Sequence, residues 1–478
     1  HNSASRTQLW GYRYIHNGKG KTPQSVPVGR LAELPFIDCI GILDCKNSFD
    51  VYINLFIPGQ GYIPESMDQI TKLLKMAACF KTICMIMCSS SLSFAKEQAQ
   101  WPMFMKDPSH SASYNSDIAL PLHMKWRFKT DGPIYSSPVV GDGLVIFGSH
   151  DSYIYALDAK SGELRWRYMT GGQITATPCI GDGIVYASSK DKLLYALDIR
   201  SGQPIWKFET GGMAVSSPTL DNGVLYFGSN DKYLYAIEAS TGKLLWKVSL
   251  DDYKWGGVYS SPAVDSGMVY IAAKNAIVYA LNADNGKEVW RFKADSAIYS
   301  SPAVSRGSLY IGSYDQKLYS LDASNGKFKW KADMDDWVYA TPLIFNGAVY
   351  AGTKEGNLYS FDTEGKLRWV FKTGSGISSS MAASAAGLGF IGSEDGSFYS
   401  IDLKTGETRW GAKTDGGIIS SPALVDNMVY IGSKDGYLYA FSGTLPEKPV
   451  NKQQVEESSA PVPTKDKAVN PIRASKKR

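Results

Sequence analysis

Histidine and cysteine, the residues that many catalytic and metal sites use, are scarce in this sequence. It has 5 His and 6 Cys in 478 residues. None of the histidines after residue 100, His110, His123 and His150, lies in a spacing typical of a Ser-His-Asp triad or a metal-ligand motif. Cys179 is the only cysteine between residues 126 and 442, so we expect no disulfide there. These absences predict that the protein is not an enzyme and binds no cofactor.

Two further absences narrow the class of protein. Residues 126–442 show no sustained 3.6-residue apolar period, so helices are not expected there. The chain also has no net charge outside its C-terminal segment. The whole chain has a net charge of +4, and residues 446–478 alone carry 8 Lys/Arg and 4 Asp/Glu. The remainder is therefore neutral. This charge distribution gives no indication of a nucleic-acid surface.

The sequence instead contains one module written eight times. A Trp ends each copy at spacings of 40, 40, 40, 44, 40, 39 and 41 residues: Trp126, Trp166, Trp206, Trp246, Trp290, Trp330, Trp369 and Trp410. A period near 40 with four short apolar runs is typical of propeller blades. Trp126 precedes the first inner strand, whereas the last copy ends at Ser442 without a Trp strand. The sequence predicts an all-β, eight-bladed β-propeller of four-stranded antiparallel blades, whose N-terminal strand closes the last blade.

Asp151 to Trp166, with Tyr-Ala-Leu-Asp at the centre, resembles the pyrroloquinoline-quinone (PQQ) repeat, and the resemblance covers about 320 residues. Within this β-propeller family the chain is similar to the propeller subunit of the bacterial outer-membrane β-barrel assembly machinery. That similarity implies a scaffold that binds protein. PQQ-dependent alcohol dehydrogenases of the family use a vicinal Cys pair, a calcium site and a catalytic Asp. Here Cys179 stands alone and the blades carry no long insertions. A quinone oxidoreductase therefore stays an alternative rather than the preferred interpretation.

The segments outside the repeats predict export. Residues 67–95 read as a signal peptide, because lysines precede the apolar run Thr82–Cys88 and small residues follow at Ser93 and Ala95. That apolar run is too short to cross a bilayer, and lipid attachment at Cys88 is a further option. We therefore expect a periplasmic or outer-membrane-associated protein. We expect residues 1–66 to be upstream translated or disordered sequence, with a small domain as the alternative. The lead-in 96–122 is expected to pack on the propeller rim, the propeller to span 123–445, and the basic tail 446–478 to be disordered.

An acidic residue recurs between the second and third strands in seven of the eight copies, with Asn275 in copy four, and this regularity predicts turn formation rather than a site. The set is Asp151, Asp191, Asp231, Asp315, Asp395 and Asp435, with Glu355 in copy six. His150 precedes the first of them, where other copies have Lys190, Asn230 and Lys434, so we expect a surface residue there.

Function on a symmetric scaffold is expected where the repeat becomes irregular. The connection before inner strand four contains Asp251–Trp255, and the one before inner strand six contains Asp333–Trp337. All such connections should lie on one face, near the mouth of the central channel. Aromatic anchors within a polar surround are typical of binding hot spots. The predicted partner-binding residues are Tyr253, Trp255, Tyr259, Tyr299, Asp335, Asp336, Trp337 and Tyr339.

Several occupants of this face are compatible with the sequence. We favour a protein partner at the bacterial envelope, either a peptide or an outer-membrane assembly component, and expect the propeller to be a monomer. A glycan is the alternative, because Trp and Tyr faces also stack on sugars, and the protein would then be a carbohydrate- or ligand-binding sensor. Trp255 and Trp337 could instead fold inward and plug the channel or pack on a neighbouring loop.

Overall fold

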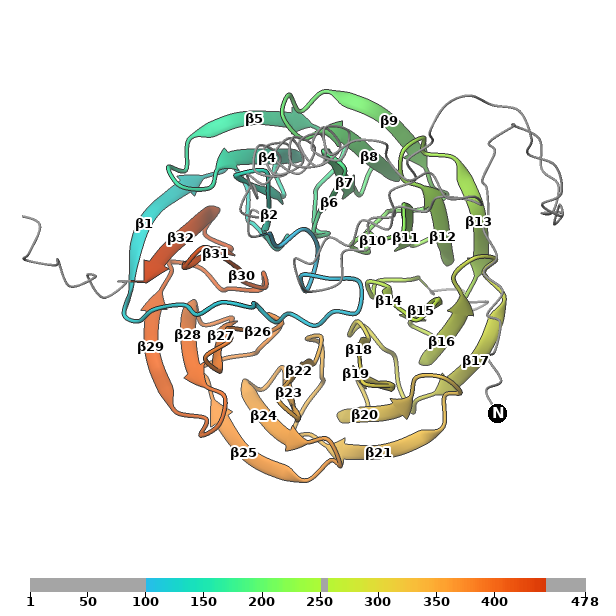
Figure 1. Ribbon diagram of the computed structural model, residues 1–478, viewed down its shortest axis with the longest axis vertical. Coiled ribbons are helices and arrows are strands. Elements are labelled where there is room, and N and C mark those ends of the chain that lie inside the picture. Colours follow the sequence, from blue (N-terminus) through green and yellow to red (C-terminus); the bar gives the residue numbers. More distant parts are fainter. Residues whose placement is uncertain (1–99, 251–256, 444–478) are drawn as a thin grey trace, which may run out of the picture. The chain divides into compact units, whose positions relative to one another are not determined.

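The computed structural model describes residues 100–250 and 257–443, in which 32 strands form eight four-stranded antiparallel sheets. The sheets stand around a central axis like the blades of a propeller (Figure 1). No helix in the described part is long and apolar enough to cross a membrane. The eight-bladed all-β fold expected from the Trp repeat is confirmed.

The two strands nearest the axis form the buried half of each blade. In most blades four of the five residues of the second strand are buried, because neighbouring blades cover both of its faces. The innermost strands are β2 (Val139–Gly141), β6 (Cys179–Gly181), β10 (Thr219–Asp221), β14 (Ala263–Asp265), β18 (Ala303–Ser305), β22 (Leu343–Phe345), β26 (Ala382–Ala383) and β30 (Ala423–Val425). The second strands are β3 (Leu144–Gly148), β7 (Ile184–Ser188), β11 (Val224–Gly228), β15 (Met268–Ala272), β19 (Ser308–Gly312), β23 (Ala348–Gly352), β27 (Leu388–Gly392) and β31 (Met428–Gly432).

The two outer strands differ in burial. The third strand is buried at its centre, whereas the outermost strand is exposed apart from a half-buried face that carries the Trp. The third strands are β4 (Tyr153–Asp158), β8 (Leu193–Asp198), β12 (Tyr233–Glu238), β16 (Ile277–Asn282), β20 (Lys317–Asp322), β24 (Asn357–Asp362), β28 (Ser397–Asp402) and β32 (Tyr437–Gly443). The outermost strands are β5 (Leu164–Met169), β9 (Pro204–Glu209), β13 (Leu244–Ser249), β17 (Glu288–Lys293), β21 (Phe328–Asp333), β25 (Leu367–Lys372), β29 (Thr408–Lys413) and β1 (Leu122–Lys129).

Strand β1 completes the last blade. It pairs with β32 so that Trp126 lies opposite Ala440, and the same register joins Trp166 to Ala156 in the first blade. The sheet order β1-β32-β31-β30 therefore combines the N-terminal strand with the last three strands of the repeat. Closure by the N-terminal strand is confirmed.

The repeated Trp joins each blade to the next. The indole Nε1 of Trp166 donates to the carbonyl of Ile199 in the second blade at 2.7 Å. Its ring lies against Gly202, where a Cβ atom would come within 2.6 Å of the indole. Trp126 makes the equivalent contact with Gly162, so it ties blade eight to blade one. Burial of an indole contributes a few kcal/mol, which favours a closed ring over separate sheets.

The recurring Asp residues form turns, as expected from their regular spacing. The carboxylate of Asp191 accepts from the Tyr195 hydroxyl at 2.6 Å, from the Gly171 N–H at 2.7 Å and from the Leu193 N–H at 3.0 Å. The Asp carboxylates of blades one, three and eight accept the same kinds of donors. These side chains therefore hold the β3–β4-type turns to the neighbouring connection.

A belt of Ser and Thr hydroxyls surrounds the channel just before the innermost strands. The backbone N–H of one belt residue donates to the hydroxyl of the equivalent residue in the next blade, and seven such bonds measure 2.8–3.2 Å. All eight members are buried. They are Ser137, Thr177, Ser217, Ser261, Ser301, Thr341, Ser380 and Ser421.

The lead-in lies across one end of the channel, in contact with the innermost strands rather than on the rim where we expected it (Figure 1). We call residues 101–119 the strap. Trp101 exchanges two backbone hydrogen bonds with Val140, and the N–H groups of Ile180, Val264 and Val304 donate to strap carbonyls at 2.7–3.0 Å. The innermost strands have a free edge toward the channel, and the backbone of the strap bonds some of the unpaired groups on that edge. This edge explains why the segment runs to the axis.

Candidate functional site

The two ends of the channel differ. The innermost strands all run in the same direction, and the strap binds their middle residues and the Asp426–Asn427 turn that follows β30. The residues that precede the innermost strands therefore lie at the opposite end. We call this end the mouth. It is the region where the sequence predicted the partner-binding residues.

Two rings of residues line the mouth, one residue from each blade in each ring, and all sixteen are half-buried. The inner ring comes just before the belt and consists of Tyr135, Thr175, Val215, Tyr259, Tyr299, Tyr339, Ser378 and Ile419. The outer ring comes from the turns between second and third strands and consists of His150, Lys190, Asn230, Lys274, Tyr314, Lys354, Glu394 and Lys434.

Five aromatic side chains form a continuous wall on one arc of the mouth: Tyr259, Tyr299, Tyr314, Trp337 and Tyr339. Tyr299 is central, with ring centroids 5.5 Å from Tyr259, 4.6 Å from Tyr314 and 6.0 Å from Tyr339. Tyr314 stacks on Trp337 at 4.4 Å with 8° between the planes. Trp337 is nevertheless 44% exposed, so one face of its indole remains available to a ligand. We call these five residues the aromatic wall.

Two tyrosines of the aromatic wall have raised pKa values. Burial, together with the nearby Tyr339, Tyr299 and Asp336, raises the pKa of Tyr314 to about 12. Burial likewise raises the pKa of Tyr339. Tyr314 and Tyr339 are therefore uncharged at neutral pH and would contact a ligand through their ring faces and hydroxyl groups.

Four lysines and one glutamate give the outer ring its charge. Lys354 forms a short ion pair with Glu394, and Lys434 Nζ lies 3.7 Å from the other oxygen of that carboxylate. Ser378 donates to Glu394 at 2.6 Å. Burial acts to raise the pKa of Glu394, but the hydrogen bonds from Lys354 and Ser378 and the two positive charges outweigh it and lower the pKa. The carboxylate is therefore held ionised inside the mouth.

The opposite arc contains a stacked Tyr135–His150 pair, with ring centroids 4.2 Å apart and 20° between planes. His150 Nε2 lies 3.3 Å from the Thr175 hydroxyl. Burial, followed by the charge of Lys190, lowers the pKa of His150 below its ordinary value of 6.5. His150 therefore presents a neutral imidazole at pH 7, half-buried in the mouth rather than on the open surface.

The structure brings together four of the eight predicted partner-binding residues, Tyr259, Tyr299, Trp337 and Tyr339. Trp337 packs on the neighbouring turn at Tyr314, which is one of the alternatives that the sequence left open, and keeps 44% of its surface exposed. Asp336 is half-buried beside Tyr314, whereas exposed Asp335 accepts a hydrogen bond from Asn357 at the start of β24. Tyr253 and Trp255 lie outside the described residues.

Sequence reasoning missed the outer ring, including Tyr314 and Lys274. These residues directly precede the recurring Asp or its substitute, and the identity of this position changes from blade to blade: His, Lys, Asn, Lys, Tyr, Lys, Glu and Lys. A position that varies from blade to blade, next to a turn residue that hardly varies, was the signal in the sequence that could have identified this ring. The variation indicates that the position is not needed for the fold.

Side chains that could be reactive or bind a metal were also sought outside the mouth. Cys179 on β6 is buried, and burial raises the pKa of its thiol to about 12. Within residues 100–250 and 257–443 no group of three or more His, Cys, Asp or Glu side chains could hold a metal ion.

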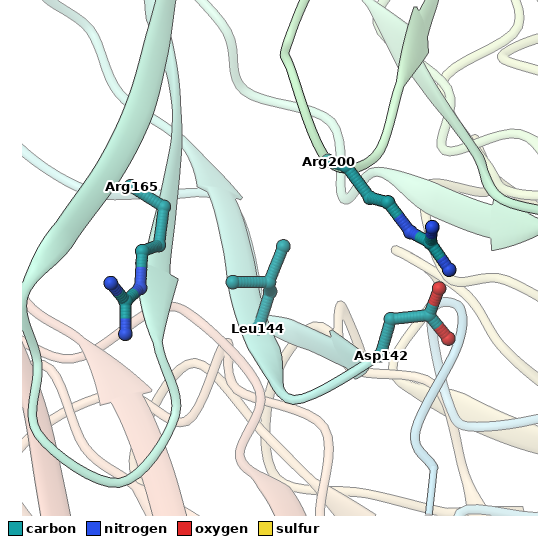
Figure 2. Close-up of a pocket in the computed structure, with 4 residues that line it drawn as sticks. All are labelled: Asp142, Leu144, Arg165 and Arg200. Atoms are coloured by element: carbon teal, nitrogen blue, oxygen red, sulfur yellow. The ribbon is translucent and has the colours of Figure 1, made fainter.

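A cavity of about 400 Å³ is lined by Asp142, Leu144, Arg165 and Arg200 (Figure 2). Asp142 and Leu144 lie at the β2–β3 turn, and therefore at the strap end of the channel. Arg165 is already paired with Asp158 at 2.8 Å. This cavity is separate from the mouth.

These features define a PQQ-like β-propeller with an irregular, aromatic and cationic mouth. A family described as "Beta-alanine-activating enzyme, beta-propeller" matches residues 181–442, more than half of the chain. The chain belongs to this β-propeller family. No curated protein sequence matches it significantly.

Several solved structures share the architecture at low identity. BamB from Moraxella catarrhalis is 18% identical, with a TM-score of 0.58 over 67% of this chain and 100% of that chain. A europium-containing methanol dehydrogenase is 15% identical, with a TM-score of 0.64 over 73% of this chain and 98% of that chain. The quinohemoprotein alcohol dehydrogenase from Comamonas testosteroni is 16% identical, with a TM-score of 0.64 over 73% and 82%. At these identities the likeness shows the fold alone.

Proposed function

We propose that this propeller is a non-catalytic, exported scaffold that binds a protein partner through the mouth of its channel. The observation that carries the proposal is the aromatic wall, in which Trp337 stacks on Tyr314 and still leaves 44% of its surface exposed. Large aromatic anchors held rigid by neighbours and surrounded by polar groups are typical of interface hot spots.

The arrangement of the site supports binding rather than chemistry. The wall lies at the end of the channel opposite the strap, and no described residue outside the two rings and their connections is bonded there, so an extended segment of another protein could bind it. The site of action that we propose is the bacterial envelope, in outer-membrane protein assembly. This part of the proposal depends on the export signal read in residues 67–95 and on the similarity to BamB.

Site-specific photocross-linking in intact cells tests the proposal. A photoreactive amino acid at position 337 should give a discrete adduct with one protein, identified by mass spectrometry. The same probe at Phe328 is the matched control, because Phe328 is also aromatic and exposed, at 53%, but lies on the outermost strand β21. Once the partner is purified, Trp337→Ala should weaken its binding by about 30-fold, the effect of a typical hot spot of ~2 kcal/mol.

Four results would contradict this function. The first is equal adduct formation at positions 337 and 328, and the second is a purified partner that binds Trp337→Ala as tightly as the parent. A quinone recovered with the purified protein by absorbance and mass would replace the scaffold with the oxidoreductase alternative. A glycan array in which Trp337→Ala abolishes a specific signal would favour the carbohydrate-binding alternative.

A further inference from the structure

Resting on the proposed function, the geometry points to the chemistry of the partner: we propose that the mouth selects an acidic segment that also carries aromatic side chains. Its carboxylates would be bound by Lys190 and Lys274, and its rings by the aromatic wall. Three features of the mouth lead to this inference.

The first feature is the charge of the outer ring. Lys190, Lys274, Lys354 and Lys434 give four positive charges and Glu394 one negative charge, so the ring carries 4 − 1 = +3 with neutral His150. Lys190, Lys354 and Lys434 are each followed by an acidic residue, but in the described part of the chain no ion pair joins the lysine to that residue. Asp191, for example, is bound by Tyr195 and by backbone N–H groups. The innermost charges that a ligand meets are therefore mainly cationic.

The second feature is a carboxylate already bound in the mouth. Glu394 is contacted by Lys354, Lys434 and Ser378, which come from blades six, eight and seven. Its lowered pKa indicates that these groups favour the ionised carboxylate despite its burial. This arc shows how lysines at outer-ring positions can hold a carboxylate in a partly buried place.

The third feature is the arc on which equivalent lysines have no carboxylate. Among the described residues, Lys190 Nζ donates to the amide oxygen of Gln173 at 2.9 Å. Lys274 Nζ lies 5.3 Å above the ring of Tyr259 and 5.6 Å above that of Tyr299. Two half-buried cations that form no ion pair within residues 100–250 and 257–443 gain from an incoming carboxylate, because part of their desolvation cost is already met in the free protein.

Asn230 lies between these two lysines in the outer ring and adds a group suited to a peptide. Its Nδ2 donates to the Tyr259 hydroxyl at 3.1 Å, and its Oδ1 is buried with no hydrogen-bond partner among the described residues. A buried acceptor without a donor is unfavourable, so rotation of this amide toward a bound segment, whose backbone N–H groups can donate to it, would be favoured.

A single-stranded nucleic acid also combines anionic groups with aromatic rings. The mouth favours a peptide because Glu394 and the flanking Asp turns would repel a continuous chain of phosphates, whereas a peptide can space its carboxylates. A nucleic acid is therefore one of the outcomes to be tested rather than the occupant that we propose.

The test is fluorescence anisotropy with the full chain and three labelled ten-residue peptides that alternate Phe with Glu, Gln or Lys. The Glu peptide should bind about tenfold more tightly than the Gln peptide, and the Lys peptide should bind more weakly than both. Lys190→Gln and Lys274→Gln should each weaken the Glu peptide by about fivefold without changing the Gln peptide. Higher salt should reduce the preference.

Lys207→Gln is the matched control. Lys207 lies 5.0 Å over Tyr195 and 5.7 Å over Tyr168, the same cation–π arrangement as Lys274, but on the outermost strand β9. This variant should bind the Glu peptide like the parent protein. Circular dichroism verifies that all variants are folded.

Equal binding of the Glu and Gln peptides, or an unchanged Lys190→Gln/Lys274→Gln double variant, would overturn the inference. If Trp337→Ala still weakens those peptides, the protein-binding function stands and only the charge preference fails. Absence of binding to every peptide also overturns the inference, and the cross-link at position 337 then decides the proposed function separately. A labelled oligothymidine that binds more tightly than the Glu peptide would replace the peptide with a nucleic acid.

Discussion

The backbone N–H of Ser421 in blade eight donates to the hydroxyl of Ser137 in blade one at 2.8 Å, although 284 residues separate them. The same kind of bond joins successive blades around the belt, from Ser137 to Thr177 at 3.2 Å and from Thr177 to Ser217 at 3.0 Å. The contact between the first and last blades is therefore chemically equivalent to the internal ones. Three contacts therefore close the ring: this hydrogen bond, the pairing of β1 with β32, and the packing of Trp126 against Gly162.

The first prediction concerns this closing bond. Ser137→Ala should lower the free energy of unfolding by about 1–3 kcal/mol, because it leaves the buried N–H of Ser421 without an acceptor. Chemical denaturation measures the change. Ser116→Ala is the control: Ser116 is exposed, and we expect a change within about 0.5 kcal/mol. Equal stability of the two variants would show that the belt hydroxyl does not contribute to closure.

The second prediction concerns the strap. The N–H groups of Val264 and Val304 donate to the carbonyls of Pro108 and Ser109 at 2.7 and 3.0 Å. A Trp101→Ala/Tyr114→Ala variant removes the two largest buried side chains of the strap, so these two amides should exchange hydrogen roughly 100-fold faster.

Hydrogen exchange followed by mass spectrometry or NMR measures this effect. The amide of Ala280, in the centre of β16, should keep its protection in the same variant. Unchanged exchange at Val264 and Val304 would mean that the strap does not protect the innermost strands.

The third prediction concerns His150. NMR titration should give its pKa below 6.5, because burial and Lys190 both disfavour the imidazolium. The pKa of His150 is lower in the folded protein than in the unfolded chain. As the pH falls, the unfolded chain therefore binds a proton at His150 before the folded protein does. The contribution of His150 to stability is therefore present above pH 6.5 and is lost as the pH falls through the folded pKa.

Lys190→Gln should raise the pKa of His150 but leave it below the ordinary value, because burial remains. Lys160→Gln, in the exposed turn after β4, is the control and should leave the titration unchanged. If the Lys190→Gln substitution leaves the pKa of His150 unchanged, the two side chains must lie further apart than the structure places them.

The fourth prediction concerns Cys179. Burial raises its thiol pKa to about 12, so the reactive thiolate is nearly absent at pH 8. Iodoacetamide should leave Cys179 unmodified in the native protein and modify it fully in denaturant, as measured by peptide mass mapping. Rapid modification of the native protein would show that β6 opens to solvent.

The repeat region shows how much of the fold could be predicted from the sequence. Spacing of the Trp residues indicated eight blades, and the position of Trp126 before the first inner strand indicated the closing strand. Both are confirmed because hairpins and contacts between adjacent blades depend on residues close in sequence or one repeat apart. The Asp turns were predicted for the same reason, since the Asp191 carboxylate binds the N–H of Leu193 two residues later.

The candidate site was predicted only in part. The break in the repeat at Trp337 drew attention to the end of the channel where the aromatic wall lies, and the Tyr residues before the innermost strands were recognised from their repeated position. The stacking of Trp337 on Tyr314 was not foreseen, since the two residues come from different connections of the ring.

The sequence by itself determined the number of blades, the pairing of strands and the sealing of the ring, because these follow from a pattern repeated every 40 residues or so. The tertiary structure decided where the strap lies and which charges and rings meet in the mouth. The free strand edges that bind the strap, and the arc that brings Lys274 over Tyr259 and Tyr299, come into existence only when eight blades curve around one axis.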